Sequence, residues 1–299
     1  MTPRLTIGLI IYNGVDIARR CIDSLIGQTY TDFVLLIHDN GSTDGTSEIC
    51  AEYAARDPRV RHLRHPQTIP QSDNFRGVLM FADSEYYMWA ADDDIWSPRF
   101  AELCIAQLDV NPDAVACCTE VNFRYPDGDV RRARGTFPIV GTPDERVRTY
   151  LHNPRDSARL YGVYRTKALQ ASYPAGLNMF GYDWLVVCLS MLHGHHLQVD
   201  GVQLLRSGHA PGKYFERYDR HFVRDTGLVG RLSWFLPLLP LSQALKAHLP
   251  RSAWRASRLR VARLNLIQLL LLLKWKWPVL NNTFLLARKV DRLFTKKHP

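Results

Sequence analysis

The sequence predicts an α/β protein with a doubly wound sheet flanked by helices, followed by a C-terminal helical amphipathic extension. Short apolar runs alternate with segments of helical periodicity through the first 120 residues, which is typical of strand–helix–strand units. Polar clusters follow three of these runs, where open α/β sheets bind their ligands. A chain of 299 residues that is 46% hydrophobic can also bury one large core.

The expected elements follow each other in a regular order. The apolar run at 5–12 predicts a buried strand, and Ile17, Cys21 and Leu25 then recur at helical spacing. Further strands are expected at 33–38, 60–64, 86–90, 114–119 and 197–199. Further helices are expected at 47–56, 74–82 and 99–110, and a hairpin tip at 125–128.

The cysteines and the N-terminus indicate an intracellular type of chain. Six cysteines occur without a CxxC pair, which argues against a zinc site and against a disulfide framework. They are expected to be buried thiols in a reducing compartment. The apolar run at 5–11 is too short for a secretory leader and is therefore interpreted as the first strand.

The net charge of +9 is concentrated at the C-terminus. Residues 251–299 contain twelve Lys or Arg and one acid, a net +11, which leaves 26 bases and 28 acids, a net −2, for residues 1–250. No module that interleaves basic and aromatic residues is visible, so nucleic acid is not expected as a partner. An anionic membrane surface fits this charge better.

The apolar stretches of the C-terminal region are short. The run at 264–273 is interrupted by Lys274 and Lys276, and it falls short of the 20 or so residues, about 30 Å, of a spanning helix. Tryptophans among basic residues are typical of helices that lie on a membrane. Residues 226–299 are therefore expected to form a membrane-associating or oligomerising tail; a helical subdomain packed on the rest of the chain or on a second copy is the alternative.

Three consecutive aspartates, Asp92, Asp93 and Asp94, follow an apolar run. Like charges at the end of a buried strand need a cation or dense hydrogen bonding. Mg²⁺ and Mn²⁺ bind such carboxylates and complete their shells with substrate phosphates. The alternative is a solvated turn that caps the helix starting near Ser97.

A second polar cluster covers residues 39–46. It could be a helix-capping turn. An EF-hand loop is excluded because Ala51 stands where the bidentate glutamate is needed. The chain also contains neither GxGxxG after the first strand nor GxxxxGK[ST], so neither a Rossmann dinucleotide site nor a P-loop is predicted.

Segments 5–13, 39–46 and 92–98, in this order, resemble the successive signatures of family 2 inverting glycosyltransferases of the GT-A fold. The resemblance extends over about residues 5–210. It implies a GT-A-type mixed sheet over 1–225, with a nucleotide-binding half at about 1–120 and an acceptor half at about 121–225.

The resemblance also implies roles at the nucleotide edge. Tyr12, Asn13 and Asp39 match positions that contact the nucleotide, and Asp39 is suited to accept a hydrogen bond from a base N–H.

Asp92 and Asp94 match the two acids that engage the ribose and the metal, so both are expected as metal ligands. Many relatives have Asp-x-Asp-Asp, which would align Ala91 with the first acid and give Asp93 the role of Asp92.

On the acceptor side, the segment 181–186 resembles the one that supplies the catalytic base, and it offers Asp183. Relatives often have Glu-Asp there, whereas this chain has Tyr182 before the acid. A helix-start acid is the alternative. Arg206 and His209 resemble an Arg-x-x-His element that closes the donor site, in which Arg206 is expected to contact the donor site and to pair with nearby acidic groups, and His209 to bind the metal or the diphosphate; the alternative is a surface histidine.

The implied function is inverting transfer of a sugar from a nucleotide-diphosphate sugar, with a UDP-sugar favoured and a dTDP-sugar as the other candidate, using Mn²⁺ or Mg²⁺. The expected acceptor is a glycan, in particular a lipid-linked one in surface polysaccharide biosynthesis, and the expected location is the cytoplasmic face of the membrane. The alternatives are a metal-dependent nucleotide-sugar phosphohydrolase, although its Asp-x-Asp-x-Thr pattern is missing, and a non-catalytic membrane-bound scaffold.

Overall fold

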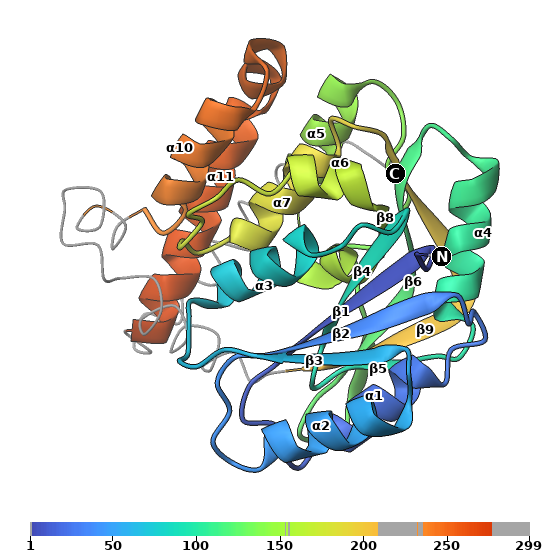
Figure 1. Ribbon diagram of the computed structural model, residues 1–299. Coiled ribbons are helices and arrows are strands. Elements are labelled where there is room, and N and C mark those ends of the chain that lie inside the picture. Colours follow the sequence, from blue (N-terminus) through green and yellow to red (C-terminus); the bar gives the residue numbers. More distant parts are fainter. Residues whose placement is uncertain (1, 153, 155, 209–231, 233–235, 277–299) are drawn as a thin grey trace.

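The computed structural model describes residues 2–152, 154, 156–208, 232 and 236–276. In this part of the chain a nine-stranded mixed sheet has helices on both faces, with strand order β3-β2-β1-β4-β8-β6-β9-β5 and with β7 paired to β6 (Figure 1). The predicted α/β class with a mixed sheet is confirmed.

The N-terminal half of the sheet is parallel. Its strands are β1 (Leu5–Ile11), β2 (Phe33–Asp39), β3 (Val60–Arg64) and β4 (Tyr86–Ala91). Every residue of β1 and β2 is buried, which explains their continuous apolar runs. In the register, Ile11 lies opposite Asp39 and Ile10 opposite Ala91, so these three strands end at the same edge.

The helices of this half lie on both faces of the sheet. They are α1 (Ala18–Ile26), α2 (Thr46–Arg56) and α3 (Gln71–Met80). In Figure 1, α1 and α2 lie below the sheet and α3 lies above it. The helix expected at 74–82 begins earlier because Pro70, which has extended backbone angles, precedes its first turn.

The second half of the sheet is mixed. Its strands are β5 (Ile95–Trp96), β6 (Ala114–Arg124), β7 (Val130–Arg132), β8 (Val163–Arg165) and β9 (His195–Ser207). Strand β8 runs antiparallel between β4 and β6, and β9 runs parallel to β6. The strand expected at 114–119 continues to Arg124, and the one expected at 197–199 covers 195–207. The apolar run of β6 ends at Thr119, beyond which buried and part-exposed residues alternate, and backbone pairing with β9 extends both strands.

Five helices surround the second half of the sheet among the described residues up to 208. They are α4 (Phe100–Val110), α5 (Pro143–His152), the 3₁₀ helix η1 (Ser157–Tyr161), α6 (Thr166–Ala171) and α7 (Tyr182–Ser190). Helix α7 contacts η1, α5 and α6. Because η1 also contacts β4 and β6, it connects α7 to the sheet.

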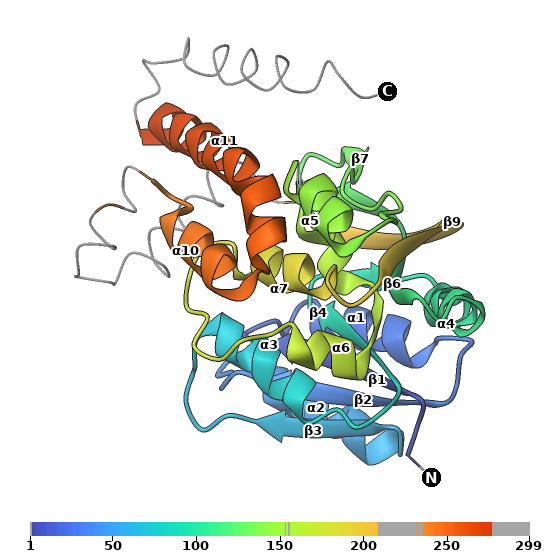
Figure 2. The same ribbon diagram turned by 90° about the horizontal axis from the view of Figure 1, so that it is seen from above.

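The described part of the C-terminal region packs on the domain, as the alternative interpretation of the tail predicted. Helix α10 (Leu239–His248) packs on α7, and α11 (Arg251–Lys276) packs along α5 (Figure 2). Arg263 donates to the carbonyl of His152, and Ser252 donates to Asp144. Within the described residues no helix has both the length and the apolarity needed to cross a membrane.

The six cysteines are buried and unpaired, as predicted. Burial raises the pKa of five of these thiols, those of Cys21, Cys50, Cys104, Cys118 and Cys188; the pKa of Cys50 rises to about 12. They behave as small apolar residues of the core.

Candidate active site

Three loops meet at the carboxyl ends of β1, β2 and β4. The Tyr12 amide donates to Asp92 Oδ2 at 3.2 Å, which ties the end of β1 to the aspartate triplet. The Asn13 amide donates to Ser42 Oγ at 3.0 Å, and Asn13 Oδ1 accepts from the Thr43 amide at 2.9 Å. The prediction that these polar clusters lie at one edge is therefore confirmed.

The loop after β1 has little room for larger residues. Asn13 has a left-handed φ of 49°, which asparagine tolerates. A Cβ on Gly14 would lie 3.0 Å from Asp92 Oδ2. The Tyr12 side chain is 47% exposed, so its ring is available to stack on a flat ligand.

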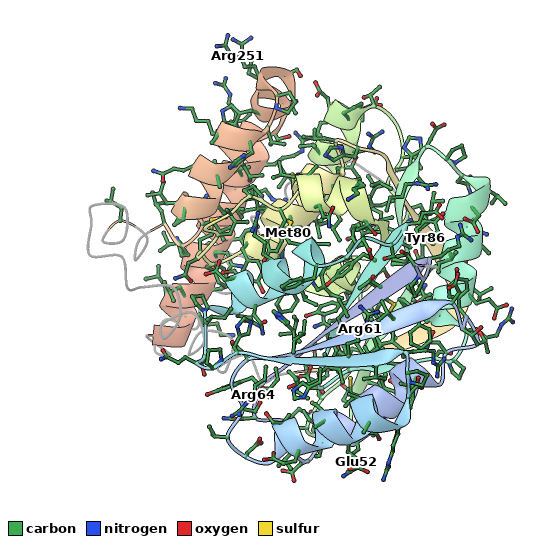
Figure 3. The ribbon with its side chains drawn as sticks, in the orientation of Figure 1. Glu52, Arg61, Arg64, Met80, Tyr86 and Arg251 are labelled. Carbon is green, nitrogen blue, oxygen red and sulfur yellow. The ribbon has the colours of Figure 1, made fainter. Side chains whose placement is uncertain are left out.

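The predicted nucleotide-binding residue Asp39 is fully buried and firmly held. Its Oδ1 accepts from the Ser42 amide at 2.8 Å, and its Oδ2 accepts from the Ser47 hydroxyl. Two basic side chains also lie near Asp39 Oδ2, with His62 Nε2 at 3.6 Å and Arg64 Nε at 3.7 Å. Figure 3 shows Arg64 on the face of the sheet that carries α1 and α2.

Burial by itself would raise the pKa of Asp39. The nearby His62 ring and the hydrogen bonds from Ser42 and Ser47 outweigh it and hold the pKa below the usual aspartate range. Asp39 is therefore a permanent negative charge, and its two oxygens orient the loop that begins at Asn40.

The triplet divides into two environments. Asp94 is buried, and its two oxygens accept from β9: Oδ2 from Arg206 Nε at 2.8 Å and Oδ1 from the Ser207 amide at 3.1 Å. Asp92 and Asp93 are only partly buried. Asp94, expected as a metal ligand, thus lies in a buried ion pair, whereas the other two carboxylates lie closer to solvent.

The electrostatics of the triplet favour a cation. Burial and the neighbouring charge of Asp93 raise the pKa of Asp92 to about 7, although the Tyr12 amide opposes this shift. Burial likewise raises the pKa of Asp94 to about 6, against the attraction of Arg206. Carboxylates crowded at a strand end are stabilised by a hard divalent ion, and an all-oxygen donor set suits Mg²⁺ or Mn²⁺.

Arg206 is predicted to contact the donor site. In the structure its guanidinium lies next to the aspartate triplet, where it pairs with Asp94. Its guanidinium lies over the ring of Tyr161 at 4.0 Å and over that of Phe123 at 5.5 Å, while it pairs with Asp94. This stacking fixes a planar cation next to the acidic edge.

The candidate base Asp183 lies at the start of α7. Its Oδ1 accepts from the Trp184 amide at 2.9 Å, and its Oδ2 accepts from the Ser157 hydroxyl. Burial raises the pKa of the phenol of Tyr161 most, and the charges of Asp94 and Asp183 both raise it further. The charges of the triplet and of Asp183 therefore both act on the same tyrosine.

His209, which the resemblance assigns to the metal or the diphosphate, lies outside the described residues. In the part that the structure describes, no three His, Cys, Asp or Glu side chains are grouped as a metal site. The described carboxylates can therefore contribute a partial ligand set, of the kind that a diphosphate completes.

Several residues of the site were not predicted from the sequence. Ser157 and Tyr161 come from a segment without periodicity, and no motif marks them. Ser42 and Ser47 could have been suspected, since they lie in or next to the turn-rich cluster that follows β2.

Comparison with known proteins identifies the class of this protein. The structure of S. aureus TarS 1-349 in complex with UDP-GlcNAc matches it with a TM-score of 0.58 at 14% identity, over 97% of this chain and 89% of that chain. The mannosyltransferase PcManGT from Pyrobaculum calidifontis, in complex with GDP-Man and Mn²⁺, matches with a TM-score of 0.52 at 15% identity, over 99% and 89%. These likenesses show the fold, which is that of GT-A glycosyltransferases.

The sequence comparisons then give the family. The family model described as Glycosyl transferase family 2 matches residues 6–171, more than half of the chain. "Uncharacterized glycosyltransferase YibD" of Escherichia coli (strain K12) is 26% identical over 251 residues, which are 78% of this chain and 72% of that protein. The chain belongs to glycosyl transferase family 2.

Proposed function

We propose that this protein transfers a sugar from a nucleotide-diphosphate sugar to a hydroxyl group of a glycan, with inversion at the anomeric carbon. The observation that carries the proposal is that η1 links Asp183 to the aspartate triplet: Ser157 of η1 donates to Asp183, and the ring of Tyr161, in the same 3₁₀ helix, lies under the Arg206 guanidinium that pairs with Asp94. The UDP-GlcNAc bound to TarS and the GDP-Man bound to PcManGT support a nucleotide sugar as donor. We favour a UDP-sugar, with a dTDP-sugar as the other candidate.

The donor binds along the edge formed by β1, β2 and β4. Tyr12 stacks on the base, and the loop held by Asp39 and Asn13 surrounds the nucleoside. Asp92 and Asp93 face the diphosphate, while Asp94 fixes Arg206 behind them. A bound Mn²⁺ or Mg²⁺, held by Asp92 with Asp93 or His209, would offset charge on the leaving diphosphate; the Mn²⁺ of PcManGT supports this part.

Asp183 supplies the proton chemistry. Its carboxylate takes the proton of the acceptor hydroxyl as that oxygen forms a bond to the anomeric carbon. The bond from the anomeric carbon to the diphosphate breaks on the opposite side, and its electron pair leaves with the nucleotide. Because the attack occurs in a single displacement, the configuration inverts.

The test is a transfer assay on the full chain with a panel of nucleotide sugars and glycan acceptors, with and without Mn²⁺. We expect sugar transfer that depends on the acceptor and stops when the metal is chelated. Nucleotide release that ignores the acceptor would indicate a phosphohydrolase instead. If no nucleotide sugar raises the thermal stability and no transfer occurs, the chain is a scaffold with this fold.

A second proposal concerns the C-terminal helices. Arg251, Arg255 and Arg258 are exposed on α11, whose sequence contains no acid, and Leu259 beside them is 78% exposed. Figure 3 shows Arg251 at the tip of α11, away from the sheet. We propose that this face binds the anionic cytoplasmic face of a membrane and brings the enzyme to lipid-linked acceptors of surface polysaccharide.

A further inference from the structure

The carboxylate of Asp183 receives a hydrogen bond from a serine far away in the sequence. Ser157 is the first residue of η1, and its hydroxyl donates to Asp183 Oδ2. No motif predicted this contact, since 26 residues separate the two positions. It joins two elements, η1 and α7, that pack against each other.

The position of Ser157 is set by its neighbours. Asp156 caps η1: its Oδ1 accepts from the Ala158 amide at 3.3 Å, and its Oδ2 accepts from the Arg134 amide at 2.9 Å. The Ala158 side chain is fully buried. The serine is therefore held between an anchored cap and a core residue, so its hydroxyl has little freedom to move away from Asp183.

The other oxygen of Asp183 is bound by its own helix. Oδ1 accepts from the Trp184 amide, and Gly181, with a left-handed φ of 80°, starts the helix at this point. Among the described residues, each carboxylate oxygen thus accepts one hydrogen bond, and a second lone pair on each can accept from a further donor. An acceptor hydroxyl can use that lone pair without displacing Ser157.

Among the described residues, few charged groups act on Asp183. Its electrostatic neighbours there are aromatic hydroxyls and one arginine: Tyr150, Tyr161, Tyr173, Tyr182 and Arg206. Leu241 of α10 lies against Gly181 at the start of α7. The guanidinium of Arg206 already pairs with Asp94. Stabilisation of an ionised Asp183 therefore depends on hydrogen bonds.

We propose that Ser157 is a positioning residue for the catalytic base: its hydroxyl orients the Asp183 carboxylate toward the acceptor and favours its ionised form. This inference rests on the proposed function, in which Asp183 accepts the acceptor's proton. Ser157 itself touches no reacting atom.

The sign of the pH effect follows from the contacts. Burial raises the pKa of Asp183, while the hydrogen bonds from Ser157 and from the Trp184 amide lower it. Removal of the Ser157 hydroxyl raises this pKa further, because the ionised form loses a donor. The acidic limb of the pH profile of kcat/KM must then move to higher pH.

The first experiment compares Ser157→Ala, Ser157→Thr and Ser157→Cys with the wild type in the full chain, using the donor and acceptor for which the wild type shows transfer. We expect Ser157→Ala to move the acidic limb by about 1 pH unit, the value of one hydrogen bond to a charged group. Ser157→Thr keeps the hydroxyl and should restore the wild-type profile. Ser157→Cys, whose thiol is a weak donor, should give a smaller shift in the same direction.

Ser190→Ala is the matched control. Ser190 is a buried serine of the same helix as Asp183, and its hydroxyl donates to the Val187 carbonyl instead. It should leave the acidic limb in place. A lower kcat for Ser157→Ala with an unmoved acidic limb would show a merely structural role and overturn the inference.

A second experiment needs no substrate. Because burial raises the folded-state pKa of Asp183, its contribution to stability is fully present below the unfolded pKa, about 4, and is lost as the pH rises through the folded pKa. Ser157→Ala should therefore lower the Tm more at neutral pH than at pH 4. In an Asp183→Asn background the same substitution should lower the Tm equally at both pH values. Equal pH dependence in the two backgrounds would contradict the proposal.

The proposed roles of Asp183 and Ser157 can be disproved separately. If Asp183→Asn retains transfer, the proposed role of Asp183 is wrong. If Asp183→Asn is inactive but the profiles of Ser157→Ala and Ser157→Cys match the wild type, only the role of Ser157 is wrong.

Discussion

The buried ion pair of Asp94 and Arg206 shows how single residues shape the donor site. Asp94, in the loop after β4, is 1% exposed, and Arg206, in β9, is 13% exposed; the two residues are 112 positions apart in the sequence. Such a pair stabilises weakly as a whole, but the loss of one partner leaves an unpaired buried charge. The pair therefore matters most for holding the triplet and β9 in register.

Arg206→Met tests this pair. We expect a loss of about 3–5 kcal/mol in the free energy of unfolding, because Asp94 would remain buried without its cation. Urea unfolding measures this loss. The matched control is Arg131→Met, which removes an exposed partner of Asp129 and should cost about 0–1 kcal/mol. A similar small loss in both variants would contradict the buried-pair interpretation.

Asp183→Asn tests the base. The amide cannot take the acceptor's proton, so we expect transfer to fall at least about 100-fold. The thermal shift produced by UDP with Mn²⁺ should stay close to that of the wild type, since the proposed role of Asp183 is on the acceptor side. Transfer within a few-fold of the wild type, or loss of the UDP-dependent shift, would speak against this assignment.

At the scale of elements, the backbone at the start of α7 sets the position of the candidate base Asp183. Gly181 has a φ of 80°, and a Cβ there would lie 3.2 Å from Leu241 of α10. The glycine is needed both for its backbone angle and for the close approach of α10. Helix α10 therefore packs against the segment that carries the candidate base, although α10 belongs to the C-terminal region.

Gly181→Ala should destabilise the protein by about 1–2 kcal/mol through its left-handed backbone alone, and by more through the contact with Leu241. Gly176→Ala is the control, since Gly176 also has a positive φ of 72° but no atom within 4 Å of its added Cβ. Chemical denaturation should rank Gly181→Ala as the more damaging change. Equal losses of unfolding free energy in the two variants would mean that Leu241 of α10 does not limit the space at Gly181.

At the scale of the whole molecule, the charge separates into two regions. The sheet carries the acidic edge, whereas α11 carries exposed arginines and packs along α5. One body thus presents an acidic donor site and a basic surface. If that surface binds a membrane, the active site is held near lipid-linked acceptors.

Replacement of Arg251, Arg255 and Arg258 by Gln tests this arrangement. Since each basic residue contributes about 1 kcal/mol near an anionic bilayer, we expect binding to vesicles of anionic lipid to weaken roughly 100-fold. Vesicle sedimentation measures this change, and transfer to a soluble acceptor should persist. The control replaces Arg19, Arg56 and Arg131, which are exposed elsewhere. Equal weakening of vesicle binding in both triple variants would show that binding depends on the net charge of the protein and not on this face of α11.

Part of the fold and the site was predictable because it leaves local signatures. Strands buried on both faces, such as β1 and β2, appear as continuous apolar runs, and helices appear as periodic ones. The polar clusters at Tyr12, Asp39 and Asp92 could be assigned to one edge because parallel strands end together.

The sequence by itself determined the class, the order of the main elements and the acidic edge with its candidate base. The tertiary structure alone decided that β5 and β8 exist, that Arg206 is committed to Asp94, and that Ser157 supports Asp183. The physical reason is the distance along the chain over which each kind of interaction acts. Periodicity records how a segment is buried, whereas these contacts join segments far apart in the chain, and they exist only when the whole sheet and its helices have closed.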